Sequence, residues 1–350
     1  MKRFFCLVLT IVLLFIMLVG CGIQIQQTEN DYTKKSGKPV KVDKDNKANQ
    51  QKTHLIACIV NQDDQYMKLL QLGMSDEADK LGVDIILANT YGKLDKEIEL
   101  INTYIKSGVD GICIHPVSED LSVPILNKAI TNGVKVISAG IAIDDKYHIG
   151  YIENDQWELG KKTGEACRDF VEKNLNGKAN IAILNYKSQF AIESNKRTEA
   201  FKSEVTKLPE VKIILEQDNA WLYESAAIQA RNIIASQPGL DIIWAANEGG
   251  TYGAVIAVKN SGKAGKIFVF GTDVSEQLLN MLLSEDNILQ AVTGQQPYEI
   301  GKQSLEQLVN EINGEQTNFI RSIHGIPLSR NNQNEVRSFV EDFKKMIGAK

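Results

Sequence analysis

Short apolar runs alternate with amphipathic segments along the chain from about residue 54 onward. The runs are too short for helices and too uniformly apolar for half-exposed strands, so they predict buried strands. Between them, apolar residues recur at helical spacing, as at Leu94, Ile98, Ile101 and Ile105 before the stop signal Gly108. The predicted strands form two series: 54–60, 83–88, 111–115 and 134–139, then 180–184, 211–215, 241–246, 266–270 and 288–292.

Regular alternation of strands and helices predicts parallel sheets that are covered by helices on both faces. Two separate series indicate an α/β protein with two doubly wound, Rossmann-like domains. The chain has 350 residues, of which 43% are hydrophobic, enough for two packed cores. Its net charge of -5 gives no general attraction to phosphate groups, so no nucleic-acid partner is predicted.

The N-terminus predicts export. Lys2 and Arg3 precede an apolar run at 4–19, which falls short of the about 20 residues that a membrane span needs. The run ends in Leu-Val-Gly-Cys, so residues 1–21 are predicted to be a lipoprotein signal peptide with a lipid anchor at Cys21. A plain membrane anchor is the alternative. Residues 22–52 are strongly polar and predict a flexible tether outside the cytoplasm, at the cell membrane.

The remaining cysteines and the known catalytic motifs give no sign of a metal site or of enzyme chemistry. Cys58 and Cys113 lie in predicted buried strands, and together with Cys167 they lack the paired spacing of a disulfide framework or a zinc site. A single disulfide bond among them is left open. The sequence has no P-loop, His-Glu-x-x-His or Gly-x-Ser-x-Gly motif. We therefore expect no enzyme activity, cofactor or metal.

Polar and aromatic residues follow nearly every predicted strand. In doubly wound sheets, ligands bind beyond the carboxyl ends of the strands. Carboxylates and amides pair with neighbouring hydroxyl groups, and aromatic faces cover the CH side of a sugar ring. The residues at these positions include Asp63, Asp64, His115, Trp221, Asn247, Glu248, Asp273 and Gln295.

With these positions in place, the chain resembles the ribose- and galactose-type solute-binding proteins of ABC transporters. The resemblance rests on the segments 73–82, 107–112, 247–248, 270–273 and 295–297, which occur in the family's order. It extends over roughly residues 54–334. It implies the type I periplasmic binding protein fold, in which two lobes joined by three crossing segments close over a ligand.

The resemblance also implies lobe boundaries and ligand contacts. The N-terminal lobe would comprise residues 53–153 and 296–324, and the C-terminal lobe residues 154–295 and 325–350. The crossing segments would lie near 152–155, 295–297 and 324–327. Ligands of doubly wound sheets bind beyond the carboxyl ends of the strands, which we call the strand-end rule. Together with this rule, the resemblance indicates eight ligand-binding residues: Asp64, Tyr66, His115, Asn195, Trp221, Asn247, Asp273 and Gln295.

Two positions depart from the family pattern. Gly140-Ile141 replaces an Asp-Arg pair that the family has after the fourth strand. An Arg expected early in the second lobe aligns with Asn195, while Arg197, two residues on, is expected to form a structural ion pair. We therefore expect a larger glycan, a deoxy sugar or a less polar molecule instead of a pentose bound in the usual way.

The sequence thus predicts a monomeric, lipid-anchored receptor that captures a sugar, oligosaccharide or sugar-like ligand and delivers it to an ABC permease. The alternative is a ligand-sensing subunit that is recognised by a membrane histidine kinase or chemoreceptor. Sugar-responsive repressors share the two-lobed core, but they carry a helix-turn-helix head. The export signal and the tether take its place here, which excludes DNA binding.

Overall fold

The computed structural model describes residues 53–144, 146, 149–218, 220–315 and 320–346. Residues 51–350 form one compact unit. The predicted signal peptide, the lipid site at Cys21 and the tether lie outside the described residues.

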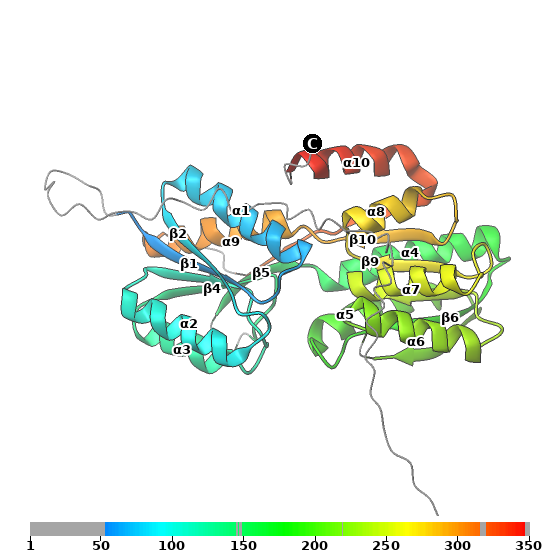
Figure 1. The fold of residues 1–350 in the computed structure, drawn as a ribbon, viewed down its shortest axis with the longest axis horizontal. Helices are drawn as coiled ribbons and strands as arrows, with labels where there is room; N and C mark the ends of the chain where they lie inside the picture. Colours follow the sequence, from blue (N-terminus) through cyan, green and yellow to red (C-terminus); the bar gives the residue numbers. More distant parts are fainter. Residues whose placement is uncertain (1–52, 145, 147–148, 219, 316–319, 347–350) are drawn as a thin grey trace, which may run out of the picture. The chain divides into compact units, whose positions relative to one another are not determined.

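The N-terminal lobe is built on a six-stranded parallel sheet with the order β11-β5-β4-β3-β1-β2 (Figure 1). Its helices cover both faces: α1 and α9 pack on one face, and α2 and α3 on the other. The elements are β1 (Leu55–Val60), α1 (Gln65–Leu81), β2 (Asp84–Asn89), α2 (Leu94–Ser107), β3 (Gly111–Ile114), α3 (Val123–Thr131), β4 (Lys135–Ala139), β5 (Gly150–Asn154), α9 (Pro297–Ile312) and β11 (Ile320–Ile323).

The C-terminal lobe has a second six-stranded sheet with the order β12-β10-β9-β8-β6-β7. The helices α6, α7, α8 and α10 cover one face, and α4 and α5 cover the other. Only β12 runs antiparallel to its neighbour. The elements are α4 (Gln156–Asn174), β6 (Lys178–Leu184), α5 (Ala191–Val205), β7 (Glu210–Gln217), α6 (Tyr223–Ser236), β8 (Ile242–Ala245), α7 (Glu248–Asn260), β9 (Phe268–Thr272), α8 (Glu276–Leu283), β10 (Leu289–Gly294), β12 (Ile326–Ser329), η3 (Arg330–Asn332) and α10 (Gln333–Met346).

The chain crosses between the two sheets three times. It leaves the first sheet after β5, returns from β10 into α9, and passes from β11 to β12 through His324 and Gly325. These crossings confirm the predicted fold class, two doubly wound α/β lobes joined by three segments. The nine predicted strands are present, and no strand end is shifted by more than two residues. β5 and β12 overlap segments that were predicted only as crossings, and β11 was not predicted.

Several helices that follow the carboxyl ends of the strands, where a ligand is expected to bind, are capped at their N-termini by side chains. Asp64 Oδ1 accepts a hydrogen bond from Met67 N at 2.8 Å at the start of α1. Asn247 Oδ1 accepts one from Gly250 N at 3.1 Å at the start of α7. Such caps satisfy backbone N–H groups that have no partner inside the helix. They fix the helix N-termini at the inner edge of each lobe.

One glycine determines how closely two helices of the C-terminal lobe approach. A Cβ atom on Gly160 in α4 would overlap the carbonyl oxygen of Arg197 in α5. Because glycine has no Cβ, the two helices touch at this point. The contact fixes the backbone that carries the Arg197 side chain.

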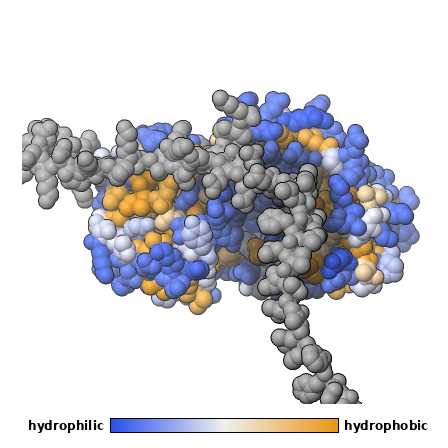
Figure 2. Space-filling view, in the orientation of Figure 1, coloured by the Kyte–Doolittle hydropathy of each residue, from blue (hydrophilic) through white to orange (hydrophobic). Residues whose placement is uncertain are grey.

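Figure 2 shows a face dominated by hydrophilic residues, on which apolar residues form separate patches. Among the described residues, no helix combines the length and the apolar character that crossing a bilayer requires.

Candidate ligand-binding site

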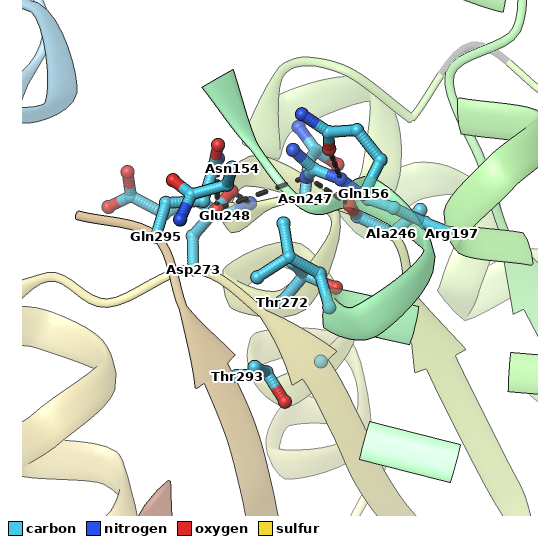
Figure 3. Close-up of polar contacts among 12 residues, drawn as sticks. Asn154, Gln156, Arg197, Ala246, Asn247, Glu248, Thr272, Asp273, Thr293 and Gln295 are labelled. Carbon is cyan, nitrogen blue, oxygen red and sulfur yellow. Dashed lines mark hydrogen bonds and ion pairs between the residues drawn. The ribbon is translucent and has the colours of Figure 1, made fainter. Parts of the chain in front are cut away.

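Asp273 lies at the centre of a cluster of polar side chains at the carboxyl ends of β9 and β10 (Figure 3). This cluster, which includes Gln295 and Arg197, is called the polar group below. Asp273 Oδ1 accepts a hydrogen bond from Gln295 Nε2 at 2.5 Å, and its Oδ2 accepts one from Glu248 N at 2.8 Å. Its backbone φ of 77° lies in the left-handed region, which non-glycine residues adopt at a cost. The surrounding hydrogen bonds hold this conformation and aim the carboxylate at the inner edge of the lobe.

Arg197 brings a positive charge to the same group. Its side chain is 4% exposed, and it donates to Gln156 Oε1 at 2.7 Å and to the Ala246 carbonyl oxygen at 2.8 Å. Its Nη1 lies 3.9 Å from Asp273 Oδ1. Among the described residues, it is the one buried Lys or Arg. Arg197 was expected to form a structural ion pair, and the structure places that pair inside the candidate site (Figure 3).

Aromatic rings of the C-terminal lobe lie beside the polar group. The Trp221 ring is tilted against Tyr186 and Phe190, with centroids 5.2 and 5.4 Å apart. The Arg197 guanidinium lies 5.6 Å from the centre of the Tyr186 ring. Aromatic faces next to carboxylates and amides suit a ligand that has both CH and polar surfaces.

Contacts between the lobes join this aromatic group to the N-terminal lobe. Gln62 accepts a hydrogen bond from Trp221 Nε1 at 2.9 Å and donates to Asp64 Oδ2 at 3.0 Å, in the amide orientation that satisfies both partners. The His115 ring contacts Phe190 edge-on, with centroids 6.5 Å apart. The two lobes therefore meet at Trp221 and Phe190.

Tyr66 and His115 form the N-terminal side of the site. Their rings contact edge-on at 5.9 Å, and His115 Nδ1 donates to the Ala139 carbonyl oxygen at 2.7 Å. This bond leaves Nε2 of the neutral imidazole as an acceptor. The Tyr66 hydroxyl is buried and has no hydrogen-bond partner among the described residues. Both side chains thus have hydrogen-bonding capacity that is still unused.

The departure at Gly140-Ile141 has a structural explanation. A Cβ atom on Gly140 would lie 2.7 Å from the Tyr66 hydroxyl and 2.8 Å from His115 Nδ1, and the Gly140 φ is 91°. Ile141 is buried and packs in one cluster with Tyr186 and Phe190. The sequence suggested that the missing Asp-Arg pair leaves room for a larger ligand. The structure shows that side chains of the protein fill part of that room.

Some of the remaining predicted residues lie close to the polar group, and others do not. Asp64 and Asn247 cap helices, and Asn247 Nδ2 also donates to the Trp221 carbonyl oxygen at 2.8 Å. Asn195 is exposed on α5, so the structure does not bring it into the group, whereas Arg197 is buried there. Tyr66, His115, Trp221, Asp273 and Gln295 lie in or beside the group as described above.

Sequence analysis missed Tyr186 and Phe190. Both lie in the loop after β6, so the strand-end rule could have named them.

Burial sets the electrostatics of the site. It raises the pKa of the Asp64, Glu153 and Glu193 carboxyls, and it raises that of Glu248 to about 7. The pKa of His115 is lowered to about 4 because burial disfavours the imidazolium, although the bond to Ala139 opposes this effect. The site therefore favours neutral side chains wherever no counter-charge is present.

We expect replacement of His115 by Gln to reduce the acid sensitivity of the fold. Between pH 6.5 and 4 the folded protein binds fewer protons at His115 than the unfolded chain, so the stability contributed by this residue falls as the pH falls. The parent should lose about 2 kcal/mol more than His115→Gln between pH 7 and pH 5. Urea unfolding at both pH values measures this difference.

Glu248 changes the stability with pH in the opposite direction to His115. The test of His115 is therefore the difference between the pH-dependent stability of the parent and that of His115→Gln. The raised pKa of Glu248 makes the folded protein bind more protons between pH 4.5 and 7, which favours folding as the pH falls. Equal changes of stability in the parent and in His115→Gln would contradict the burial of a neutral imidazole.

Cys58, Cys113 and Cys167 are all buried and free, although Cys58 and Cys113 are directly opposite in neighbouring strands. Within the described part of the chain, no group of three or more His, Cys, Asp or Glu side chains is arranged to hold a metal ion. Two doubly wound lobes with aromatic and polar side chains at their facing strand ends define a two-lobed α/β binding protein.

Comparison with known proteins gives the family. The model of the periplasmic binding protein domain matches residues 56–316. The chain is 30% identical over 256 residues to the ABC transporter periplasmic-binding protein YphF of Escherichia coli (strain K12), covering 71% of this chain and 77% of the relative. It is 27% identical over 254 residues to the D-allose-binding periplasmic protein of the same organism, covering 69% and 78%.

A solved structure supports the fold independently. An ABC transporter solute binding protein from Bacillus halodurans C-125 with bound myo-inositol is similar, with a TM-score of 0.74 at 20% identity, over 83% of this chain and 99% of that one. The present chain belongs to the periplasmic binding protein family. Its relatives are solute-binding proteins and not enzymes, as the sequence predicted, and the family implies a location outside the cytoplasm.

Proposed function

We propose that this protein captures a sugar or a similar polyhydroxylated molecule between its lobes and delivers it to an ABC importer. The observation that carries the proposal is the Asp273–Gln295–Arg197 group beside the Trp221 ring. Carboxylate, amide and guanidinium groups bind hydroxyl groups, and an aromatic ring covers the CH face of a sugar. Tyr66 and His115 would add contacts from the N-terminal lobe.

Ligand contacts from both lobes would favour a closed form. Closure is stabilised only by interactions that the open form lacks. Two hydrogen bonds between the lobes are contacts of this kind within the protein. Trp221 Nε1 donates to the Gln62 amide oxygen at 2.9 Å, and Glu276 N donates to Gln65 Oε1 at 3.4 Å. In this proposal the importer's permease recognises the closed form.

The proposal also includes the lipid anchor, the lobe boundaries and the monomeric state. A lipid on Cys21 and the polar tether at 22–52 would hold the receptor near the permease. The crossings after β5, after β10 and between β11 and β12 support a hinge at the predicted lobe boundaries. The relative named as an ABC transporter protein favours transport over a sensor role.

A ligand screen tests the proposal. The compact unit of residues 51–350 is unfolded and refolded to remove any bound ligand, and its melting temperature is recorded with pentoses, hexoses, deoxy sugars, polyols and short oligosaccharides. A ligand at about 100 times its dissociation constant adds about 2.7 kcal/mol and raises the melting temperature by several degrees. If no compound raises the melting temperature, the proposed function is refuted.

A further inference from the structure

Two carboxyl groups from different lobes, with three buried oxygens between them, act on each other next to the candidate site. Glu119 lies in the loop between β3 and α3 of the N-terminal lobe, and Glu193 lies in the first turn of α5 of the C-terminal lobe. The Glu119 carboxyl acts directly on Glu193 and, together with burial, raises the pKa of the Glu193 carboxyl. The Glu193 side chain is 4% exposed.

No side chain of the described residues donates a hydrogen bond to the buried oxygens of this pair. Both carboxyl oxygens of Glu193 and Oε1 of Glu119 are buried without a hydrogen-bond donor. Arg197 is buried nearby, but it donates to Gln156 and Ala246. Two ionised carboxylates only accept hydrogen bonds and repel each other, so the pair needs either a proton or a cation from outside the protein.

The surroundings of the pair are also rich in carboxyl groups. The charged or titratable groups that act on Glu193 are Glu119, Glu153, Tyr186 and Arg197. Lys196 on the same helix lies 3.9 Å from Glu153 and is 46% exposed. Arg197 interacts electrostatically with both Glu193 and Asp273, so the carboxyl pair and the proposed sugar-binding group share one neighbourhood.

Aromatic rings make the same neighbourhood favourable for a cation. Phe190 and Tyr186 both contact Trp221, and Phe190 lies one turn before Glu193 at the start of α5. Aromatic faces attract ammonium groups, and a primary ammonium has three N–H donors. Three buried carboxyl oxygens lack a donor.

We infer that the ligand carries a primary ammonium group, as in an amino sugar or an amino polyol, and that this group binds between Glu119 and Glu193. The inference rests on the proposed function, because the hydroxyl groups of the same ligand would bind near Asp273 and Gln295. In the ligand-free protein a proton occupies Glu193, and the ammonium replaces it. Binding of an amine therefore releases a proton, and its affinity rises with pH below the pKa of the amine.

The test compares each amine with its hydroxyl parent. Glucosamine and glucose, galactosamine and galactose, and an amino-deoxy-inositol and myo-inositol are titrated into the refolded protein at pH 6 and 7 by calorimetry. N-Acetylglucosamine controls for size without charge. We expect at least one amine to bind about tenfold or more tightly than its parent, and buffers of different ionisation enthalpy should reveal the released proton.

The outcomes separate this inference from the proposed function. If neutral parents bind as tightly as their amines or more tightly, the ammonium site is wrong while the sugar receptor stands. If no member of any pair binds, both are wrong for these classes of compound.

Two variants test the residues themselves. Glu193→Gln and Glu119→Gln keep the size of the side chain but remove the charge, so each should abolish the preference for the amine and the proton release. Glu172→Gln, exposed on α4, is the matched control and should keep both. A Glu193→Gln protein that folds and retains the preference and the proton release would refute the assignment.

Discussion

Replacement of Asp273 by Ala should weaken binding of the best sugar from the ligand screen by roughly a hundredfold or more. The Asp273 carboxylate holds Gln295 Nε2 at 2.5 Å and lies 3.9 Å from Arg197 Nη1. Its removal takes away a charged acceptor and frees Gln295 from its position, whereas Arg197 keeps its hydrogen bonds to Gln156 and Ala246. Hydrogen bonds to charged groups contribute about 1.5–3 kcal/mol each, and about 2.7 kcal/mol corresponds to a hundredfold change. Calorimetric titration measures the loss.

Two control variants separate binding from backbone strain. Ala at a φ of 77° is strained, whereas Asn tolerates the left-handed region, so Asp273→Asn should retain more stability and still lose much of the affinity. Asp79→Ala, exposed on α1, should bind like the parent. If Asp273→Ala also binds like the parent, the ligand does not bind at the ends of β9 and β10.

Replacement of Arg197 by Met should lower the free energy of unfolding by about 3–5 kcal/mol, because removal of one partner from a buried charge group leaves the other charges uncompensated. Arg197 is 4% exposed and is surrounded by Asp273, Glu193 and Tyr186. The melting temperature should fall by roughly 10 °C. Urea unfolding and thermal melts at pH 8 measure the two quantities.

The pH dependence of this defect distinguishes charge from packing. Without Arg197 the nearby carboxyls are neutralised only by protons, so the defect should be smaller at pH 5 than at pH 8. Arg231→Met, exposed on α6, is the control and should change stability little. A defect of equal size at both pH values would indicate that Arg197 stabilises the fold by packing alone.

Most of the fold could be predicted because many of its strands are buried and bounded by polar turns, although β2 and β7, which were also predicted as buried, are partly exposed. β1 and β3 are runs of apolar residues that only a covered sheet can accommodate. β5, β11 and β12 were missed as strands because they are short and carry polar residues. β11 is mostly exposed, and β12 contains Pro327 and pairs antiparallel at the edge of its sheet.

The candidate site could be predicted only in part. The position of Asp273 and Gln295 follows from the strand-end rule, because the carboxyl ends of parallel strands meet at one edge of a sheet. The strand-end rule does not show whether Asn195 or Arg197 of α5 faces the site. Residues two apart on a helix point in nearly opposite directions, so the packing of α5 on α4 at Gly160 decided which one faces the site.

The sequence by itself therefore determined the order of the strands and helices, the two sheets and the residues at their carboxyl ends, because these depend on local periodicity. The tertiary structure decided which side chains meet. Tyr66 and His115 fill the space at Gly140 because distant segments meet there. Contacts between distant segments also bring Glu119 and Glu193 together from opposite lobes. Burial gives those side chains their properties, and burial exists only once the two lobes have packed.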